Sequence, residues 1–194
     1  MKKINLLTTD NTPNSFALNF PLCLHQKKLR ALGTDVRLFF NIEEALFDCD
    51  VLCVNSKYFR TWWPTNKAGI LASLSAFKDR VSTLLWFDTG DSSGTTQFQV
   101  LPYVDGYYKN QILKDKRAYL QSYYGSRLFT DYYHRECDIE DEDVFYTTCV
   151  PSENDLKKID VSWNFGLGDY GVHANFYGKL RKYLTVPYRF SIHF

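Results

Sequence analysis

Val81-Ser82-Thr83-Leu84-Leu85-Trp86-Phe87 is an apolar run that leads directly into Asp88-Thr89-Gly90-Asp91-Ser92-Ser93-Gly94. β-Branched and aromatic residues that follow one another without polar alternation are typical of a strand buried on both faces. The carboxylates and hydroxyls after Phe87 do not belong in a core, because burying an unpaired carboxylate is costly. The stretch therefore predicts a central strand at residues 81–87 and a polar loop at the edge of its sheet.

The composition is that of a globular protein. The chain has 194 residues, of which 45% are hydrophobic and 23% are charged, and its net charge is +1. This size fits one domain covering residues 1–194, with a core in about residues 1–120 and a less regular remainder in residues 121–194. A nearly neutral chain gives no electrostatic reason to expect nucleic acid or an anionic membrane as a partner.

The cysteines and the N-terminus favour a cytoplasmic location. The five cysteines are odd in number and form no CxxC pair, so reduced thiols are the simplest interpretation. Residues 1–7 lack the long apolar segment of a signal peptide, and no apolar run approaches the length that spans a bilayer.

Strand and helix patterns alternate along the first half of the chain. Short apolar runs predict strands, and apolar residues at helical spacing predict helices. The predicted strands are residues 4–9, 36–40, 50–54 and 81–87; the predicted helices are one capped by Asn19 with Pro21 in its first turn, a short one at 42–47, and one capped by Thr65. This order is typical of an α/β fold with a Rossmann-like parallel sheet and helices on both faces.

Polar residues follow three of these predicted strands. Asp10 follows the first strand, Asn55 and Ser56 follow the third, and Asp88 begins the loop after the fourth. Because the carboxyl ends of parallel strands meet at one edge, and ligands bind there, we expect these side chains to share a site.

The second half of the chain has a less regular pattern. Residues 100–104 predict a fifth strand, after which Asp105 is expected to cap a helix that runs to about residue 119 and carries Lys109 and Lys114 on a basic face. Tyr133 and His134 belong to an aromatic patch, and residues 136–143 predict an exposed acidic loop. Residues 159–163 predict a last strand, and a glycine-rich turn starts at Asn164.

Several enzyme classes are excluded by their motifs. The triplet Asp88-Thr89-Gly90 matches that of aspartic proteases, but it occurs once and in an α/β pattern, whereas those enzymes need two such carboxylates. The sequence has no P-loop, no GxGxxG after the first strand, no GxSxG and no HExxH. Neither the cysteines nor the acidic residues 136–143 have the spacing of a metal site.

The carboxylates after Phe87 have two interpretations from chemistry alone. Asp88 and Asp91 can hold a divalent cation or the hydroxyls of a sugar, a capacity that Thr89, Ser92 and Ser93 extend. Alternatively, either carboxylate caps a turn.

Several segments together resemble the N-terminal half of bacterial GT-B-like glycosyltransferases from surface-polysaccharide clusters. The similarity covers roughly residues 1–175. The segments are Leu85-Trp86-Phe87-Asp88-Thr89-Gly90-Asp91-Ser92-Ser93-Gly94, Val100-Leu101-Pro102-Tyr103-Val104-Asp105, Asp50-Val51-Leu52-Cys53-Val54-Asn55-Ser56-Lys57-Tyr58-Phe59, Tyr108-Lys109 with Leu113-Lys114-Asp115, Thr130-Asp131-Tyr132-Tyr133-His134, and Ser162-Trp163-Asn164-Phe165-Gly166-Leu167-Gly168.

This resemblance implies transfer of a sugar from a nucleotide-sugar to an acceptor in polysaccharide biosynthesis, without a metal or other cofactor. In the GT-B arrangement the N-terminal domain offers the acceptor surface and a second domain holds most of the donor. The chain stops at Phe194, before a second domain of that kind, so the resemblance implies that a further domain or a partner chain completes the cleft.

The resemblance also implies roles for individual residues. Asp88 or Asp91 is expected to act as the general base that deprotonates the acceptor hydroxyl. The expected substrate contacts are Asp10, Asn55, Ser56, Thr89, Ser92, Ser93, Asp105, Lys109, Lys114, Tyr133, His134 and Asn164. The alternatives are a non-catalytic carbohydrate- or nucleotide-binding module that needs a partner chain, and a purely structural domain.

Overall fold

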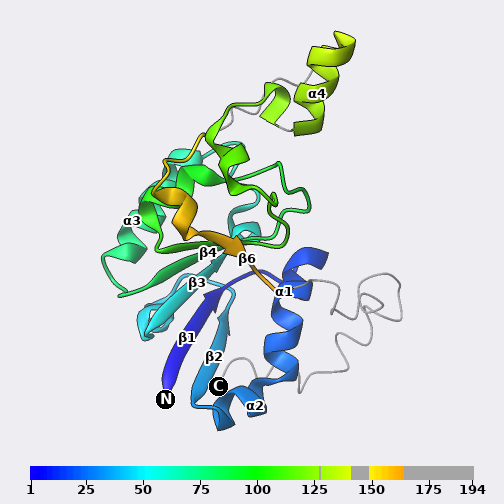
Figure 1. The fold of residues 1–194 in the computed structure, drawn as a ribbon. Coiled ribbons are helices and arrows are strands. Elements are labelled where there is room, and N and C mark those ends of the chain that lie inside the picture. The colour runs from blue at the N-terminus through cyan, green and yellow to red at the C-terminus, as the bar shows by residue number, and fades with distance from the viewer. Residues whose placement is uncertain (127, 141–148, 164–194) are drawn as a thin grey trace.

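The fold is α/β, with a parallel sheet and helices on both faces, as the sequence predicts. It is seen in a computed structural model that describes residues 1–126, 128–140 and 149–163 (Figure 1). In this part of the chain the sheet has six strands, all parallel to their neighbours. The strands are β1 (Lys2–Leu7), β2 (Thr34–Phe39), β3 (Val51–Asn55), β4 (Leu84–Asp88), β5 (Gly106–Lys109) and β6 (Ile159–Val161).

The strand order is β2-β1-β3-β4-β5-β6. The chain steps from β1 outward to β2 and then returns to place β3 on the other side of β1. The order therefore reverses between β1 and β3, which is the topological switch point of a Rossmann-like sheet. Loops leaving the carboxyl ends of these two strands diverge, and polar groups can gather between them.

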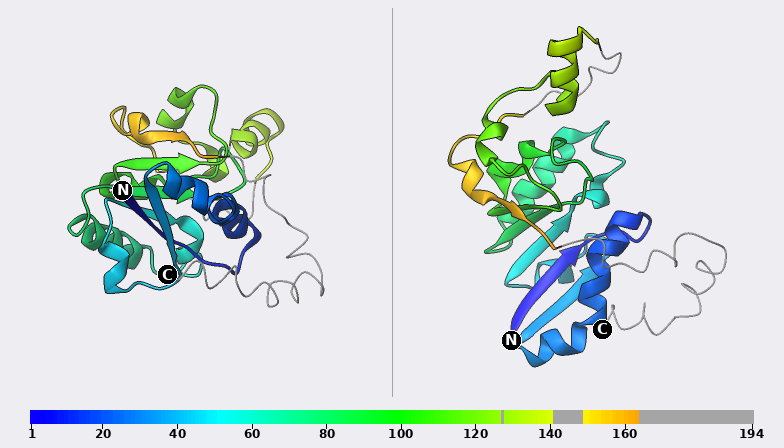
Figure 2. Two further views of the ribbon diagram at one scale, coloured as in Figure 1. Left: turned by 90° about the horizontal axis from the view of Figure 1, so that it is seen from below. Right: turned by 45° about the vertical axis from the view of Figure 1, so that its right-hand side comes forward.

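Helices cover the two faces of the sheet (Figures 1 and 2). The helices α1 (Pro13–Leu24) and α2 (Gln26–Ala31) lie on one face, whereas α3 (Lys67–Lys78) lies on the other. The helix α4 (Leu128–Cys137) projects from the body in Figure 1 and in the right-hand view of Figure 2. Short 3₁₀ helices complete the described residues: η1 (Glu44–Phe47), η2 (Ser56–Phe59), η3 (Phe98–Tyr103), η4 (Lys116–Leu120), η5 (Tyr124–Ser126) and η6 (Asp155–Lys158).

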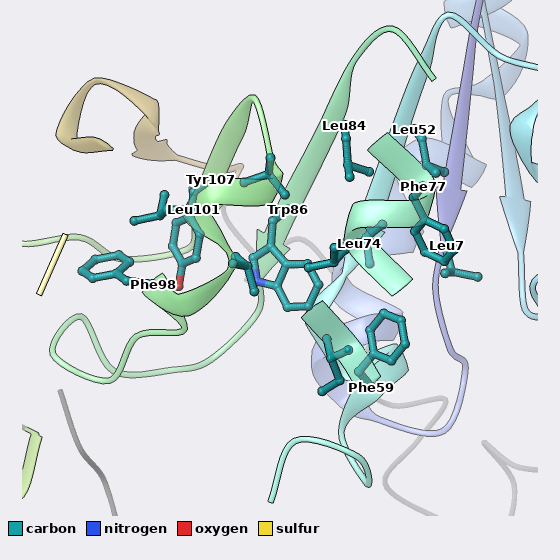
Figure 3. Packing of buried hydrophobic residues seen from close by; sticks show 14 of the residues in the cluster. Leu7, Leu52, Phe59, Leu74, Phe77, Leu84, Trp86, Phe98, Leu101 and Tyr107 are labelled. Carbon is teal, nitrogen blue, oxygen red and sulfur yellow. The ribbon is translucent and has the colours of Figure 1, made fainter. Parts of the chain in front are cut away.

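The main core lies between the sheet and α3. Figure 3 shows Trp86 of β4 between Leu74 and Phe59 on one side and Tyr107 on the other. All four side chains are almost completely buried. Since an aromatic side chain and a leucine each bury a large apolar surface, this cluster supplies much of the hydrophobic stabilisation.

The first helix begins earlier than the sequence predicts. We expected Asn19 to cap it, but Thr12 is the N-cap, and its hydroxyl accepts a hydrogen bond from the Ser15 amide at 3.1 Å. Proline is favourable at the first helical position because its missing N–H needs no partner there, and Pro13 occupies that position. Pro21 instead lies inside α1, and Asn19 is buried against the sheet edge.

The fifth strand also differs from the prediction. Residues 98–103 form η3, and the strand β5 starts at Gly106, so Asp105 precedes a strand and does not cap a helix. A short apolar run is the same signal for a buried strand and a buried helical turn, and periodicity alone does not separate them. The short helix η4 occupies only the end of the predicted 105–119 helix, with Asp115 as its N-cap.

Two further differences concern helix boundaries. Asn66, not Thr65, caps α3, and its side chain accepts from the Gly69 amide at 3.0 Å. Glu136 and Cys137 belong to α4, while residues 138–140 are exposed as predicted for an acidic loop. The rest of that acidic segment, and Asn164 with the glycine-rich turn after it, lie outside the described residues.

Candidate functional site

The carboxyl ends of β1, β3 and β4 meet at the switch point. The Asn55 amide nitrogen donates to the hydroxyl of Thr8, which follows β1, at 3.0 Å. The Thr89 hydroxyl, which follows β4, donates to the side-chain oxygen (Oδ1) of Asn55 at 3.1 Å. One asparagine therefore joins the ends of all three strands, and the expected convergence at this edge is present.

The first turns of α1 close this polar group from one side. Asn55 also donates to the Ser15 hydroxyl at 3.0 Å, and Thr8 donates to the Asn19 side-chain oxygen at 3.0 Å. Ser15 and Asn19 are one helical turn apart and so share the face that meets the sheet. Because Asn55, Thr8 and Ser15 are completely buried, their polar groups are used inside the protein.

Ser56 and Thr89 belong to the same buried group. The Thr89 amide donates to the Ser56 hydroxyl at 3.1 Å, and the two hydroxyls are 3.4 Å apart. The Lys57 amide donates to Asn55, which completes the cap of η2. Asn55, Ser56 and Thr89 thus form a buried hydrogen-bond network beneath the edge, and their side chains do not face solvent.

Asp88 lies at the end of β4 in a buried ion pair. Its carboxylate accepts from Lys109 at 2.9 Å and from the Tyr107 hydroxyl, while its other oxygen accepts from the Gly90 amide at 2.9 Å. The side chains of Lys109 and Asp88 are 0% and 4% exposed. Burial, together with the negative charge of Asp88, raises the pKa of Tyr107 well above its usual value, which keeps the phenol a hydrogen-bond donor.

The accessible polar groups of the edge lie around these buried residues. We call Asp10, Asn14, Asp91, Ser92 and Ser93 the carboxyl-edge surface; Asp91 is exposed and the others are partly exposed. The Asn14 amide nitrogen, in the first turn of α1, donates at 2.7 Å both to the Thr89 carbonyl and to Asp91. These contacts fix the loop after β4 against α1.

Asn14 is the member of this surface that sequence reasoning missed. The signal was present, since Asn14 follows a threonine and a proline that together start a helix directly after the first strand. Placing the helix start at Asn19 put Asn14 in a turn and removed it from consideration.

Other predicted substrate contacts lie elsewhere. Asp105 accepts from the Leu84 amide at 2.8 Å and pairs with Lys78, so it lies at the amino edge of the sheet, where β4 begins. Lys114 is exposed in the loop after β5. Tyr133 and His134 belong to α4, where the His134 ring stacks on Tyr124 with 3.7 Å between ring centroids.

The described residues hold no group of three or more histidine, cysteine or carboxylate side chains placed to bind a metal ion. Among the helices of this same part of the chain, none combines the length and apolarity needed to cross a bilayer.

The polar groups of the carboxyl-edge surface can bind a polar ligand. Hydroxyl, amide and carboxylate groups are accessible above the buried, mutually hydrogen-bonded side chains, and such groups pair with the hydroxyls of a ligand. Comparison with known proteins adds no assignment: no family model, curated protein or solved structure matches the chain.

Proposed function

We propose that the chain is the acceptor-side domain of a glycosyltransferase-like protein, which works in the cytoplasm and binds a sugar acceptor at the carboxyl-edge surface. The observation that carries the proposal is the meeting of the β1, β3 and β4 ends at the switch point, with Asp91, Ser92 and Ser93 accessible above them. Ligands of open α/β sheets bind at this position. Carboxylates and hydroxyls suit the paired hydroxyls of sugars.

Asp91 is the better candidate for the general base. Asp88 is buried and its carboxylate is already used by Lys109, Tyr107 and the Gly90 amide. Asp91 is exposed, and one of its oxygens is held by Asn14. In the proposed step Asp91 takes the proton of the acceptor hydroxyl, whose oxygen bonds to the anomeric carbon of the donor as the bond from that carbon to the nucleotide phosphate breaks.

The second candidate is a binding module without catalysis. The ion pair of Asp88 favours it, because that pair removes one of the two carboxylates from chemistry at the edge. In this case a partner chain would supply the donor site, and Asp91 would only accept hydrogen bonds from the sugar.

Saturation-transfer NMR and a product assay separate these functions. The probes are UDP-glucose, UDP-N-acetylglucosamine, lactose and maltose, each added to the purified chain and to Asp91→Asn. Asp79→Asn is the matched control, because Asp79 is also exposed but follows α3 at the opposite edge of the sheet.

Sugar transfer by the wild type and Asp79→Asn, lost in Asp91→Asn, would support the glycosyltransferase. Binding without transfer, weakened only in Asp91→Asn, would support ligand binding at the carboxyl-edge surface, which both functions require. If none of the four probes binds to the wild-type chain, both functions are contradicted.

A further inference from the structure

A buried ion pair lies directly beneath the loop that carries Asp91. Lys109 of β5 donates to Asp88 at 2.9 Å, and the Lys109 side chain is completely buried. The two residues are paired in the register of neighbouring strands, so the interaction runs straight across the carboxyl edge. A buried pair brings little net stability, because both charges lose their hydration, and its value often lies in fixing one conformation.

The pair holds both backbone groups of Gly90. The Gly90 amide donates to Asp88 at 2.9 Å, and the Gly90 carbonyl accepts from Lys109 at 3.2 Å. A side chain at this position would be crowded: a Cβ there would lie 3.0 Å from the Asp88 carboxylate and 3.2 Å from the Lys109 nitrogen, so these groups would have to shift by a few tenths of an ångström. The chain therefore wraps closely around the ion pair at this position.

The same loop is held from the side of α1. Asn14 donates at 2.7 Å to the Thr89 carbonyl, the peptide group just before Gly90, and to the Asp91 carboxylate just after it. Three consecutive residues, Thr89, Gly90 and Asp91, are thus fixed by side chains from three different elements, α1, β4 and β5.

We infer that Lys109 is a positioning residue for the ligand site: through Asp88 and the Gly90 carbonyl it fixes the backbone that presents Asp91. The inference rests on the proposed function for its ligand, but the holding of the loop stands on the contacts alone. A loop held in its binding conformation pays less ordering entropy when a ligand binds. Lys109 acts on the ligand without touching it.

The test removes the ion pair without leaving one charge buried. In Asp88→Asn/Lys109→Met both charges are absent, while the shapes and the acceptor for the Gly90 amide are largely kept. Lys3→Met/Asp48→Asn is the matched control, since it removes an ion pair of 2.8 Å that is exposed and lies at the amino edge. The first readout is NMR hydrogen exchange of the Thr89 and Gly90 amides, which donate to Ser56 and Asp88 and need no ligand to be measured. The second readout is the affinity for whichever of the four sugar probes the wild type binds.

We expect exchange in the loop to speed up by at least about tenfold and affinity to fall by about tenfold in the site variant, with neither effect in the control. Unchanged exchange, or faster exchange with unchanged affinity, would overturn the positioning role. Faster exchange in a protein whose wild type binds no probe would contradict the proposed function and support the holding of the loop by Lys109.

A second variant perturbs the Asp88–Lys109 pair without changing either of its residues. Gly90→Ala keeps both charges but places a methyl group against them, at the two distances given above. We expect the same faster exchange and weaker binding, so the inference stays testable even if the double variant does not fold. Unchanged exchange of the neighbouring amides in Gly90→Ala would also overturn it.

Discussion

Asn55 and Thr8 are joined by a hydrogen bond of 3.0 Å across the point where the strand order of the sheet reverses. Thr8 continues β1 by one residue and Asn55 ends β3, so the bond ties together the two strands whose following segments diverge. Where the backbone hydrogen bonds between β1 and β3 end, hydrogen bonds between polar side chains continue the connection. The accessible groups of the edge rest on this buried connection.

Asn55→Ala should lower the free energy of unfolding by about 2–3 kcal/mol, because buried hydrogen-bonding groups are left without partners. The Thr89 hydroxyl and the Lys57 amide both lose their acceptor in this variant. Urea unfolding followed by tryptophan fluorescence measures the change. Asn154→Ala, at an exposed asparagine, is the control and should change stability by less than about 0.5 kcal/mol. Equal values for the two variants would contradict the structural role of Asn55.

Leu74→Ala should destabilise the protein by about 3–5 kcal/mol, because it opens a cavity between α3 and the sheet. Leu74 is 0% exposed and lies beside Trp86 in Figure 3. Leu32→Ala is the matched control, since Leu32 is 73% exposed, and it should cost less than about 0.5 kcal/mol. Thermal unfolding by circular dichroism measures both. A small effect for Leu74→Ala would mean that the core does not pack as described.

Much of the fold was predictable because each β segment is a short apolar run with a polar end. Such runs identify β1, β3 and β4 within a few residues. The fifth strand was predicted wrongly because residues 100–104 are equally apolar, and only tertiary contacts decide that residues 98–103 form a helical turn. Gly106 then starts β5, although glycine is a weak strand former, and its neighbours leave little room for a side chain: a Cβ there would lie 3.0 Å from Leu85 and from Tyr108.

The site was predictable only in its location. Topology alone places the ends of β1, β3 and β4 together, and they are together. Sequence does not tell which polar side chains face solvent and which face one another. Lys109 was predicted on the basic face of a helix, yet it is completely buried beside Asp88, because β5 brings it to the edge of the sheet. Which carboxylate is accessible is thus decided by pairing between strands.

Tyr107→Phe should cost about 1–2 kcal/mol at neutral pH, because Asp88 loses a donor and the Gln97 amide loses its acceptor at 3.0 Å. The pKa of Tyr107 is raised well above its usual value by burial and by Asp88. The unfolded chain ionises its tyrosines at about pH 10 while folded Tyr107 stays neutral, so this residue's contribution is full below that pH and is lost above it. The stability difference between wild type and variant should therefore stay constant up to about pH 10 and shrink as the pH rises above that value. A constant difference in urea titrations would contradict the burial of the phenol.

Asp35→Asn should lower stability by about 1 kcal/mol at neutral pH, since the carboxylate on edge strand β2 accepts from Arg30 at 2.7 Å and from Arg37 at 3.1 Å. The hydrogen bond from Arg30 is the main cause that lowers the pKa of Asp35; partial burial opposes it and Arg37 adds to it. A lowered folded pKa gives stability that is full above about pH 4 and is lost as the pH falls through the lowered value. The difference between wild type and variant should accordingly disappear in acid, as measured by thermal unfolding across the range. If the stability difference between wild type and Asp35→Asn grew in acid, the stabilising role of the ion pair would be contradicted.

Asn14→Asp tests the contact between α1 and the loop after β4. The amide nitrogen of Asn14 lies 2.7 Å from Asp91, so a carboxylate at this position would face another one. The helix dipole opposes this repulsion, because a negative charge in the first turn of α1 is stabilised by about 0.3–1 kcal/mol. Like charges about 4 Å apart repel by about 1 kcal/mol in water and by about 4 kcal/mol at a protein surface, so repulsion should win.

The reference variant for this test is Asn14→Ala, which loses the same two hydrogen bonds without adding a charge. We expect Asn14→Asp to be less stable than Asn14→Ala by about 1 kcal/mol at low salt, with a gap that narrows in about 1 M sodium chloride, because salt screens exposed charges. Urea unfolding of both variants at the two salt concentrations measures the gap. If Asn14→Asp were the more stable of the two, the helix dipole would outweigh the repulsion, and Asp91 would not lie against α1 in solution.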